Sequence, residues 1–458
     1  MARDPAGRFA HLREALRARS RAFQPARLAV TAFLAVIVLI TLALCAPWAT
    51  RSGKPASVID ALFTATSSVC VTGLESVPTH SYWSSWGHVA MLAGIQVGGL
   101  GVMTIGALFG LLVTRRIGLT QRLLAASETK GALGQVGALV RVVAAISVSV
   151  ELIIALFLFP RFLVAGDSTG RAAWHALFYG VSAFNNAGLA PTSDGLAPFV
   201  SDVGVLLPVA VGVFIGALGF PVLMNISRRW SQPRSWTLHT KLTLTMALVL
   251  AVIAPIVIGL FEWRNPATLG DQPVPTRVLG LFFAGVAPKT SGFTLMEHAD
   301  VTAQTSLVQV ALMLVGGGSA STAGGIKVTT LAVMLLAIRA EARGDRDIEA
   351  FGRRIPPEVL RAAVGVVVAG IVILFVAVLL LLTTTSAPMD QVIFEAASAF
   401  ATCGLTTGLS ATLPVAGKLT LIALMLIGRL GTMTLAAALA LTSRRSVLRW
   451  PAERPLVG

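Results

Sequence analysis

Charged residues are scarce in this chain of 458 residues: Asp, Glu, Lys and Arg together make up only 12%. Soluble domains carry about 25% charged residues, so this is not an ordinary soluble protein. Hydrophobic residues make up 55% and gather in runs long enough to cross a bilayer. The composition therefore indicates a multi-pass membrane protein.

Groups that perform chemistry are also few. The three cysteines, Cys45, Cys70 and Cys403, show no metal-ligand spacing and no disulfide framework. The six histidines are scattered, and no phosphate-binding loop or intramembrane Ser–His pair accompanies them. We therefore expect neither an enzyme nor a covalently bound cofactor.

No cleavable signal peptide is evident at the N-terminus. The basic arm 1–27 leads into an apolar run, 28–48, that is long enough to span a membrane. The net charge of +15 could suggest nucleic acid, but its distribution argues otherwise. With the N-terminus inside, 26 of the 36 Lys and Arg residues fall on inner segments and eight on outer segments. This is the positive-inside bias, with membrane lipid as the partner and nucleic acid not expected.

One short pattern occurs four times in the chain. A Phe lies ten positions before a Gly, and a large apolar residue follows each Gly: Phe63–Gly73, Phe178–Gly188, Phe282–Gly292 and Phe394–Gly404. The glycines are 104 to 115 positions apart. Four copies at nearly even spacing indicate fourfold internal repetition.

Each copy lies between two long apolar runs, which predicts a unit of span, half-helix, loop and span. The half-helices are expected at 60–68, 174–184, 277–286 and 391–401, each too short to cross a bilayer. The predicted fold class is an all-α membrane protein with eight transmembrane helices and four re-entrant pore loops around one pore. Its predicted parts are a cytoplasmic arm 1–27, pore repeats 28–113, 138–228, 237–340 and 361–443, and a cytoplasmic tail 444–458. The second span of the second repeat is expected at 203–226.

The four loops are candidates for an ion filter. Non-helical backbone at membrane depth is tolerated only where it is buried or lines water. A Gly in each loop can adopt the angles that point carbonyl oxygens inward, and rings of carbonyls replace the hydration shell of potassium. Each half-helix would also direct its partly negative C-terminal end at the ion. The alternative is that the glycines only form turns or packing points, but four copies with one shared offset favour a cation pathway.

A glycine-rich run interrupts the second span of the third repeat. Five glycines occur within 316–325, and each destabilises a helix by about 1 kcal/mol relative to Ala. We therefore predict a broken, mobile segment, residues 316–327, here called the gate loop, lying across the pore. The alternative is a close helix-packing surface of small residues. The predicted gate residues are Gly316, Gly317, Gly318, Ser319, Ser321, Thr322, Gly324, Gly325, Lys327 and Arg429.

Two of these gate residues carry charge at membrane depth. Arg429 lies between Gly428 and Gly431, and an intramembrane charge is a functional hypothesis by default. It could face the cavity below the filter, pair with Glu395 or Glu151, or do both. Lys327 could mark the inner end of the gate loop or snorkel to the inner interface. The Gly-x-x-Gly pairs at 98/101, 216/219 and 428/431 are interpreted as helix-packing points.

The sequence resembles the Ktr/Trk/HKT superfamily of potassium transporters, most of all the Ktr membrane subunit, over 25–443. The residues that carry the resemblance are Thr66–Leu74, Ser182–Leu189, Lys289–Phe293, Phe400–Thr407 and Gly316–Lys327. It implies one pore per subunit, with Gly73, Gly188, Gly292 and Gly404 as selectivity glycines, and it places Arg429 at the pore. Four glycines fit a preference for potassium.

The filter residues expected from the pattern and the resemblance are Val71, Thr72, Gly73, Asn186, Ala187, Gly188, Thr290, Ser291, Gly292, Thr402, Cys403 and Gly404. Potassium would bind the backbone carbonyls of Thr72, Ala187, Ser291 and Cys403. Because these four residues differ, coordination would be uneven, which predicts looser selectivity than in a symmetric tetramer.

The predicted function is potassium uptake across the bacterial inner (plasma) membrane, with both termini cytoplasmic. The alternative is a non-selective or sodium-permeable cation transporter of the same fold, whereas a receptor or scaffold would not need four re-entrant loops. The resemblance further implies a homodimer on a cytosolic RCK-type ring of nucleotide-binding subunits. ATP or ADP would then act only through that partner, and sodium dependence is common in the family.

Overall fold

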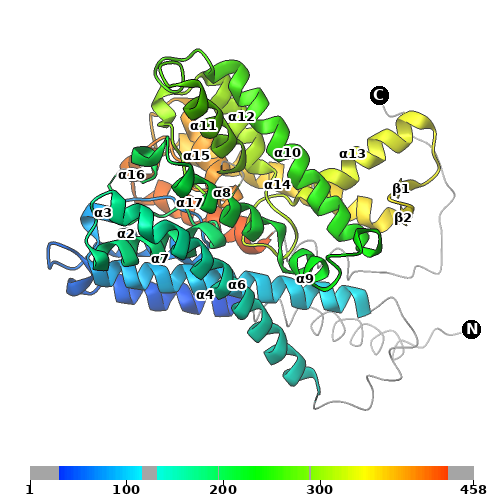
Figure 1. The fold of residues 1–458 in the computed structure, drawn as a ribbon, viewed down its shortest axis with the longest axis horizontal. Helices are drawn as coiled ribbons and strands as arrows, with labels where there is room; N and C mark the ends of the chain where they lie inside the picture. The colour runs from blue at the N-terminus through cyan, green and yellow to red at the C-terminus, as the bar shows by residue number, and fades with distance from the viewer. Residues whose placement is uncertain (1–29, 116–130, 194, 288–289, 432–458) are drawn as a thin grey trace, which may run out of the picture.

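The computed structural model describes residues 30–115, 131–193, 195–287 and 290–431. The predicted basic arm 1–27, the predicted tail 444–458 and Lys289 lie outside the described residues. The described part is mostly helical (Figure 1).

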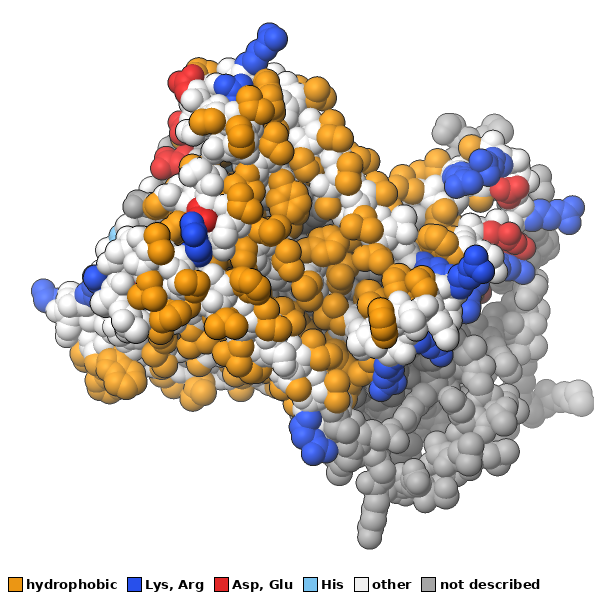
Figure 2. Space-filling view, viewed as in Figure 1, with side chains coloured by type: hydrophobic (Ala, Val, Ile, Leu, Met, Phe, Trp, Pro, Cys, Tyr) orange, Lys and Arg blue, Asp and Glu red, His pale blue; other side chains and the backbone are white. Residues whose placement is uncertain are grey.

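Four long apolar helices contain segments that meet the length and composition of a membrane span. They are α4 (Ser85–Arg115), α6 (Gly131–Val164), α10 (Leu238–Glu262) and α14 (Pro357–Leu382), and the spanning segments are 22 to 26 residues long. About 20 apolar residues suffice to cross the hydrocarbon core. A fifth apolar helix, Val30–Leu44, begins at the edge of the described region and belongs to the first predicted span. Large hydrophobic side chains cover the broad outer face of the bundle, whereas Lys and Arg gather around α9, α13 and the hairpin (Figure 2).

Four short helices alternate with the long ones. They are α2 (Val58–Val69), α7 (Thr169–Asn185), α11 (Val274–Val286) and α15 (Met389–Ala401), with 12 to 17 residues each. Their ends agree with the predicted half-helices to within five residues. Minor elements in the connections are η1 (Pro47–Ala49), α3 (Thr79–Tyr82), η2 (Ala197–Phe199), η3 (Pro233–Ser235), η5 (His298–Asp300) and α16 (Leu409–Thr412).

The predicted span 203–226 is bent rather than straight. The chain instead forms α8 (Val203–Leu218) and α9 (Phe220–Arg228), which are bent by 97° at Gly219. Pro221 has no N–H to donate to the carbonyl of Ala217, four residues earlier, which leaves that carbonyl without a helical partner and favours a kink or a break here. Gly219, with φ +90°, provides the sharp turn.

The third repeat's second span is broken where the glycine-rich run predicted a break. It consists of α12 (Ala303–Leu314), a loop, and α13 (Val328–Arg343). A short antiparallel hairpin follows, β1 (Ile348–Ala350) and β2 (Arg353–Ile355), so the prediction of an all-α fold is incomplete. In Figure 1, α13 and this hairpin extend away from the rest of the bundle.

The two ends of the described chain pack together. Helix α17 (Val415–Leu426) contacts α2, and Lys418 Nζ lies 2.7 Å from Asp60 Oδ1 across this contact. One continuous apolar cluster includes residues of α2, α4, α15 and α17. After α17 the backbone widens into a single π-helical turn, η6 (Ile427–Gly431), a distortion that is frequent at functional sites.

Candidate functional site: a ring of four glycine segments above a buried loop

The four repeated glycines lie next to one another in a closed ring. A methyl group on Gly73 would meet the carbonyl oxygen of Ala187, and one on Gly188 would meet that of Ser291. In the same way Gly292 faces the oxygen of Cys403, and Gly404 faces the oxygen of Thr72. Each added carbon would lie 2.8 Å or less from the oxygen. Residues 71–73, 186–188, 290–292 and 402–404, here called the ring segments, therefore meet around one axis.

The backbone of the ring segments has one shared geometry with one exception. All four glycines have positive φ, between +65° and +97°. In three segments the residue two positions earlier, Val71, Asn186 or Thr402, is also left-handed. The third segment differs, since no positive φ occurs at Thr290. A left-handed valine is uncommon and costs on the order of 1–3 kcal/mol, a strain of the kind found at functional sites.

Three serines that the sequence analysis did not single out support the ring segments from behind. Ser67 and Ser398 accept from the backbone N–H of Gly73 and Gly404, each at 3.1 Å. Ser182 instead donates to the carbonyl of Leu189 at 2.8 Å. Each serine lies six positions before its glycine, and this recurrence was available in the sequence.

The predicted gate loop leaves α12 and returns to begin α13. Its ends pair with each other, because the N–H of Gly316 donates to the carbonyl of Ile326 at 2.8 Å and Val328 donates to Gly317 at 3.1 Å. Most of its residues, including Ser321 and Thr322, are buried. The segment is thus a compact, buried loop and not a row of small residues on one face of a continuous helix.

The bend between α8 and α9 packs against this loop and forms backbone hydrogen bonds with it. The Ala217 carbonyl that Pro221 leaves without a helical partner accepts from Gly318 N–H at 2.7 Å. Phe220 N–H donates to the carbonyl of Ala320 at 3.1 Å. The break in the second repeat and the loop of the third repeat therefore satisfy each other's backbone groups, which buried backbone requires.

The loop also touches the fourth ring segment. A methyl group on Gly324 would overlap the Thr402 hydroxyl and would lie 2.7 Å from the carbonyl oxygen of Ala401. Only glycine permits this approach. The loop therefore contacts residues of both the second and the fourth ring segments and their short helices.

Lys327 is folded back onto the loop. Its ammonium group donates to the carbonyls of Ala323 at 2.7 Å and Gly324 at 3.4 Å, and the side chain is buried. The alternative of snorkelling to the inner interface is therefore wrong, and Lys327 lies at the C-terminal end of the gate loop, directly before α13.

Arg429 is 1% exposed and donates from Nη1 to the carbonyl oxygen of Thr322. Within the described residues, its Nε and Nη2 atoms have no hydrogen-bond partner. The alternative of an ion pair with Glu395 or Glu151 is wrong. Glu395 accepts from Thr406, Thr407 and Ser410, and Glu151 accepts from Asn185.

The glycines interpreted as packing points differ from one another. Gly98, Gly216 and Gly428 lie against the carbonyls of Val69, Phe184 and Phe400, at the C-terminal ends of the short helices. Close packing is confirmed for these three. Gly219 is also closely packed, since a methyl group there would lie 2.5 Å from the carbonyl oxygen of Ser319, and it is in addition the position of the bend between α8 and α9.

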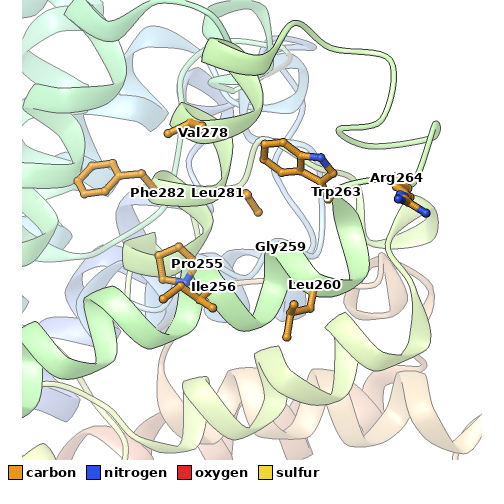
Figure 3. Close-up of a pocket in the computed structure, with 9 residues that line it drawn as sticks. All are labelled: Pro255, Ile256, Gly259, Leu260, Trp263, Arg264, Val278, Leu281 and Phe282. Carbon is orange, nitrogen blue, oxygen red and sulfur yellow. The ribbon is translucent and has the colours of Figure 1, made fainter.

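An apolar groove of about 700 Å³ opens between α10 and α11 on the outer surface of the bundle (Figure 3). Pro255, Leu260 and Phe282 contribute to its walls, and Trp263 and Arg264 lie at one end. None of the ring or gate residues lines this groove. The candidate site is therefore the ring and the gate loop, and not this surface feature.

The long apolar helices and the buried charged groups define a helical, multi-pass membrane protein. A family model described as "Cation transport protein", TrkH, matches residues 11–448. The chain belongs to this TrkH family of cation transport proteins, which confirms the superfamily predicted from the sequence.

Relatives of this chain cover nearly its whole length. Ktr system potassium uptake protein B of Bacillus subtilis is 37% identical over 433 residues, covering 94% of this chain and 96% of that protein. The protein of the same name from Vibrio alginolyticus is 36% identical over 441 residues, covering 94% of each chain. Potassium/sodium uptake protein NtpJ of Enterococcus hirae is 32% identical over 445 residues, covering 95% and 97%. The crystal structure of the potassium transporter TrkH from Vibrio parahaemolyticus shares the fold, with a TM-score of 0.67 at 18% identity over 89% of this chain and 84% of that one.

Proposed function

We propose that this chain takes up potassium across the cell membrane through the ring segments, with the gate loop controlling passage. The observation that carries the proposal is the closed ring, in which the carbonyls of Thr72, Ala187, Ser291 and Cys403 each lie beside the glycine of a neighbouring segment. Carbonyl oxygens in a ring replace the hydration shell of an alkali cation. The proposed architecture is four fused span–half-helix–span units, each half-helix directing the negative end of its dipole toward the ring.

The gate loop and Arg429 would oppose conduction from below the ring. The loop is compact and buried, and Arg429 binds its Thr322 carbonyl. A fixed positive charge below a cation filter raises the barrier for a second cation at low dielectric. Opening would require the loop to move and Arg429 to lose this backbone partner.

A second candidate is a transporter of the same fold that also admits sodium. The relative named potassium/sodium uptake protein supports it, and so do the differences among the ring segments, since four unequal segments hold an ion less uniformly than four identical ones. Potassium remains favoured, because glycine occupies all four positions.

The partners and orientation proposed here rest on the family resemblance and on charge. Both termini would lie in the cytoplasm of a bacterial cell, on the Lys- and Arg-rich side. The chain would form a homodimer on a cytosolic ring of RCK-type subunits, and ATP or ADP would act only through those subunits.

The test is uptake by the full chain. Expression in a strain that cannot take up potassium should restore growth at low potassium, and purified protein in liposomes should pass potassium faster than sodium. Growth rescue with equal fluxes of the two ions would favour the second candidate. Absence of both rescue and flux, with the protein present in the membrane, would refute the proposal.

A further inference from the structure

Asn186 joins two parts of the molecule that lie far apart in the sequence. It caps α7 in a left-handed conformation, with φ 60° and ψ 40°. Its Nδ2 donates to Thr322 Oγ1 of the gate loop at 2.6 Å, 136 residues away. Its Oδ1 accepts from Thr290 Oγ1 of the third ring segment at 2.7 Å, 104 residues away.

The direction of each hydrogen bond in this chain of groups is fixed. The Thr322 hydroxyl donates its one proton to the carbonyl of Phe184 at 3.2 Å, so it can only accept from Asn186. Since Asn186 uses its amide as donor there, its carbonyl oxygen is left to accept from Thr290. Thr290, Asn186, Thr322 and Phe184 thus form one connected series of hydrogen bonds.

Burial makes each of these hydrogen bonds consequential. Asn186 and Thr322 are 0% exposed and Thr290 is 2% exposed. A buried polar group that loses its partner costs more than the net gain from the bond itself, because no water replaces the partner. The Asn186 amide also lies 3.4 Å from the Phe184 carbonyl, so movement of Thr322 takes away the 2.6 Å partner of the amide and leaves it only this longer contact.

Two of the four ring carbonyls are adjacent to this series. Asn186 directly precedes Ala187, whose carbonyl lies beside Gly73, and Thr290 directly precedes Ser291, whose carbonyl lies beside Gly188. A shift in the position of Asn186 or Thr290 should therefore also move the carbonyl of the residue that follows it, Ala187 or Ser291.

We propose that Asn186 is a positioning residue that makes ion selectivity depend on the seating of the gate loop. While Thr322 is seated, the Ala187 and Ser291 carbonyls are held at their spacing; when it leaves, both relax. The inference rests on the proposed function, since it assumes that the ring selects ions and that the loop moves. By linkage, an ion that fits the ring also stabilises the seated loop.

The neighbouring Ser321 supplies a matched control. It is also 0% exposed and lies in the same loop, but its hydroxyl accepts from the backbone N–H of Ala323 within the loop, at 3.3 Å. Ser321→Ala should loosen the loop without touching the ring segments. Thr322→Val removes the hydroxyl bonded to Asn186 while keeping the side-chain shape, and Thr322→Ser keeps the hydroxyl.

The experiment measures potassium and sodium fluxes of the full-length variants in liposomes. Thr322→Val should lower the potassium-to-sodium flux ratio by about threefold to tenfold, the size expected for one buried hydrogen bond. Thr322→Ser should keep the wild-type ratio, and Ser321→Ala should change the total flux but not the ratio. A wild-type ratio in Thr322→Val, or an equal fall in Ser321→Ala, would overturn the coupling.

A second variant approaches the same link from the ring side. Thr290→Val removes the donor to Asn186 and should raise the resting flux, although the Thr290 hydroxyl does not donate to the loop. In the double variant with Thr322→Val, the two effects on the ratio should not add, because both act through one amide. Full additivity of the two effects would overturn the coupling. A wild-type protein without preference for potassium would instead refute the proposed function.

Discussion

Replacing Gly292 by alanine tests the ring with the smallest change that the structure offers. Gly292 has φ +65°, and its added methyl carbon would lie 2.8 Å from the Cys403 carbonyl oxygen and 3.1 Å from the Gly404 Cα. An ordinary carbon–oxygen contact is about 3.3 Å or longer. The Cys403 carbonyl would therefore have to withdraw by about 0.5 Å.

Two energies follow from this geometry. The left-handed backbone costs an alanine about 1–2 kcal/mol wherever it occurs. The displaced Cys403 carbonyl should in addition change how strongly the ring binds potassium relative to sodium. A change of about 1.4 kcal/mol in the difference between potassium and sodium binding lowers selectivity tenfold, and we expect a loss of at least that order.

Gly408 separates the two energies. It has φ +84°, four residues beyond the ring, and a methyl group added there would meet nothing within 4 Å. Gly408→Ala should therefore lower stability by a similar amount and leave selectivity unchanged. The assay is the ratio of potassium to sodium flux in liposomes, with thermal melting in detergent to compare stability.

The reasoning would be refuted if Gly292→Ala kept the wild-type flux ratio although both variants, Gly292→Ala and Gly408→Ala, lost the same amount of stability. It would also be refuted if both variants lost selectivity alike, because strain alone would then explain the effect.

Four further outcomes are expected. Arg429→Met removes the charge that binds the gate loop, so potassium flux in liposomes should rise severalfold; flux at or below wild type would contradict this role. Replacing 316–325 with a shorter linker should raise transport and weaken control by any cytosolic ring, and unchanged flux would count against the gate. Lys418→Met leaves the Asp60 carboxylate, whose side chain is 16% exposed, without its ion-pair partner; it should lower the free energy of unfolding by about 1–3 kcal/mol, and a melting temperature equal to wild type would show that the pair contributes nothing. Burial lowers the pKa of His298, partly offset by the charge of Asp390. Because the unfolded chain then binds the proton more tightly, stability should fall as the pH drops from 7 through about 6.5 and below, and His298→Gln should reduce this slope in melting experiments.

The ring could be predicted from the sequence because its signal is local and repeated. A Phe and a Gly at one fixed offset occur in every copy, and the glycine density of 316–325 exceeds what a helix tolerates. Both signals depend on the backbone propensities of nearby residues, which can be evaluated from a short stretch of sequence.

The bend at Gly219 could not be predicted in the same way. Single Gly and Pro residues are common in membrane helices, and most are accommodated without a break. What stabilises this bend is the N–H of Gly318, about a hundred residues later in the chain. A prediction from one segment cannot include a partner contributed by another.

The partner of Arg429 was missed for a related reason. A sequence search for partners of a buried charge considers acidic side chains, and Glu151 and Glu395 were the available ones. The structure uses the backbone carbonyl of Thr322 instead. Carbonyls occur at every residue, so composition and spacing carry no information about which one is used.

The ring of four glycines is made by one polypeptide, and this has a consequence for how the aperture can evolve. In an assembly of four identical subunits, a single codon change appears at four places at once. Here each codon alters only one of the four ring segments. Under the proposed function, variation can therefore change one segment, such as that of Asn186, while the other three stay as they are.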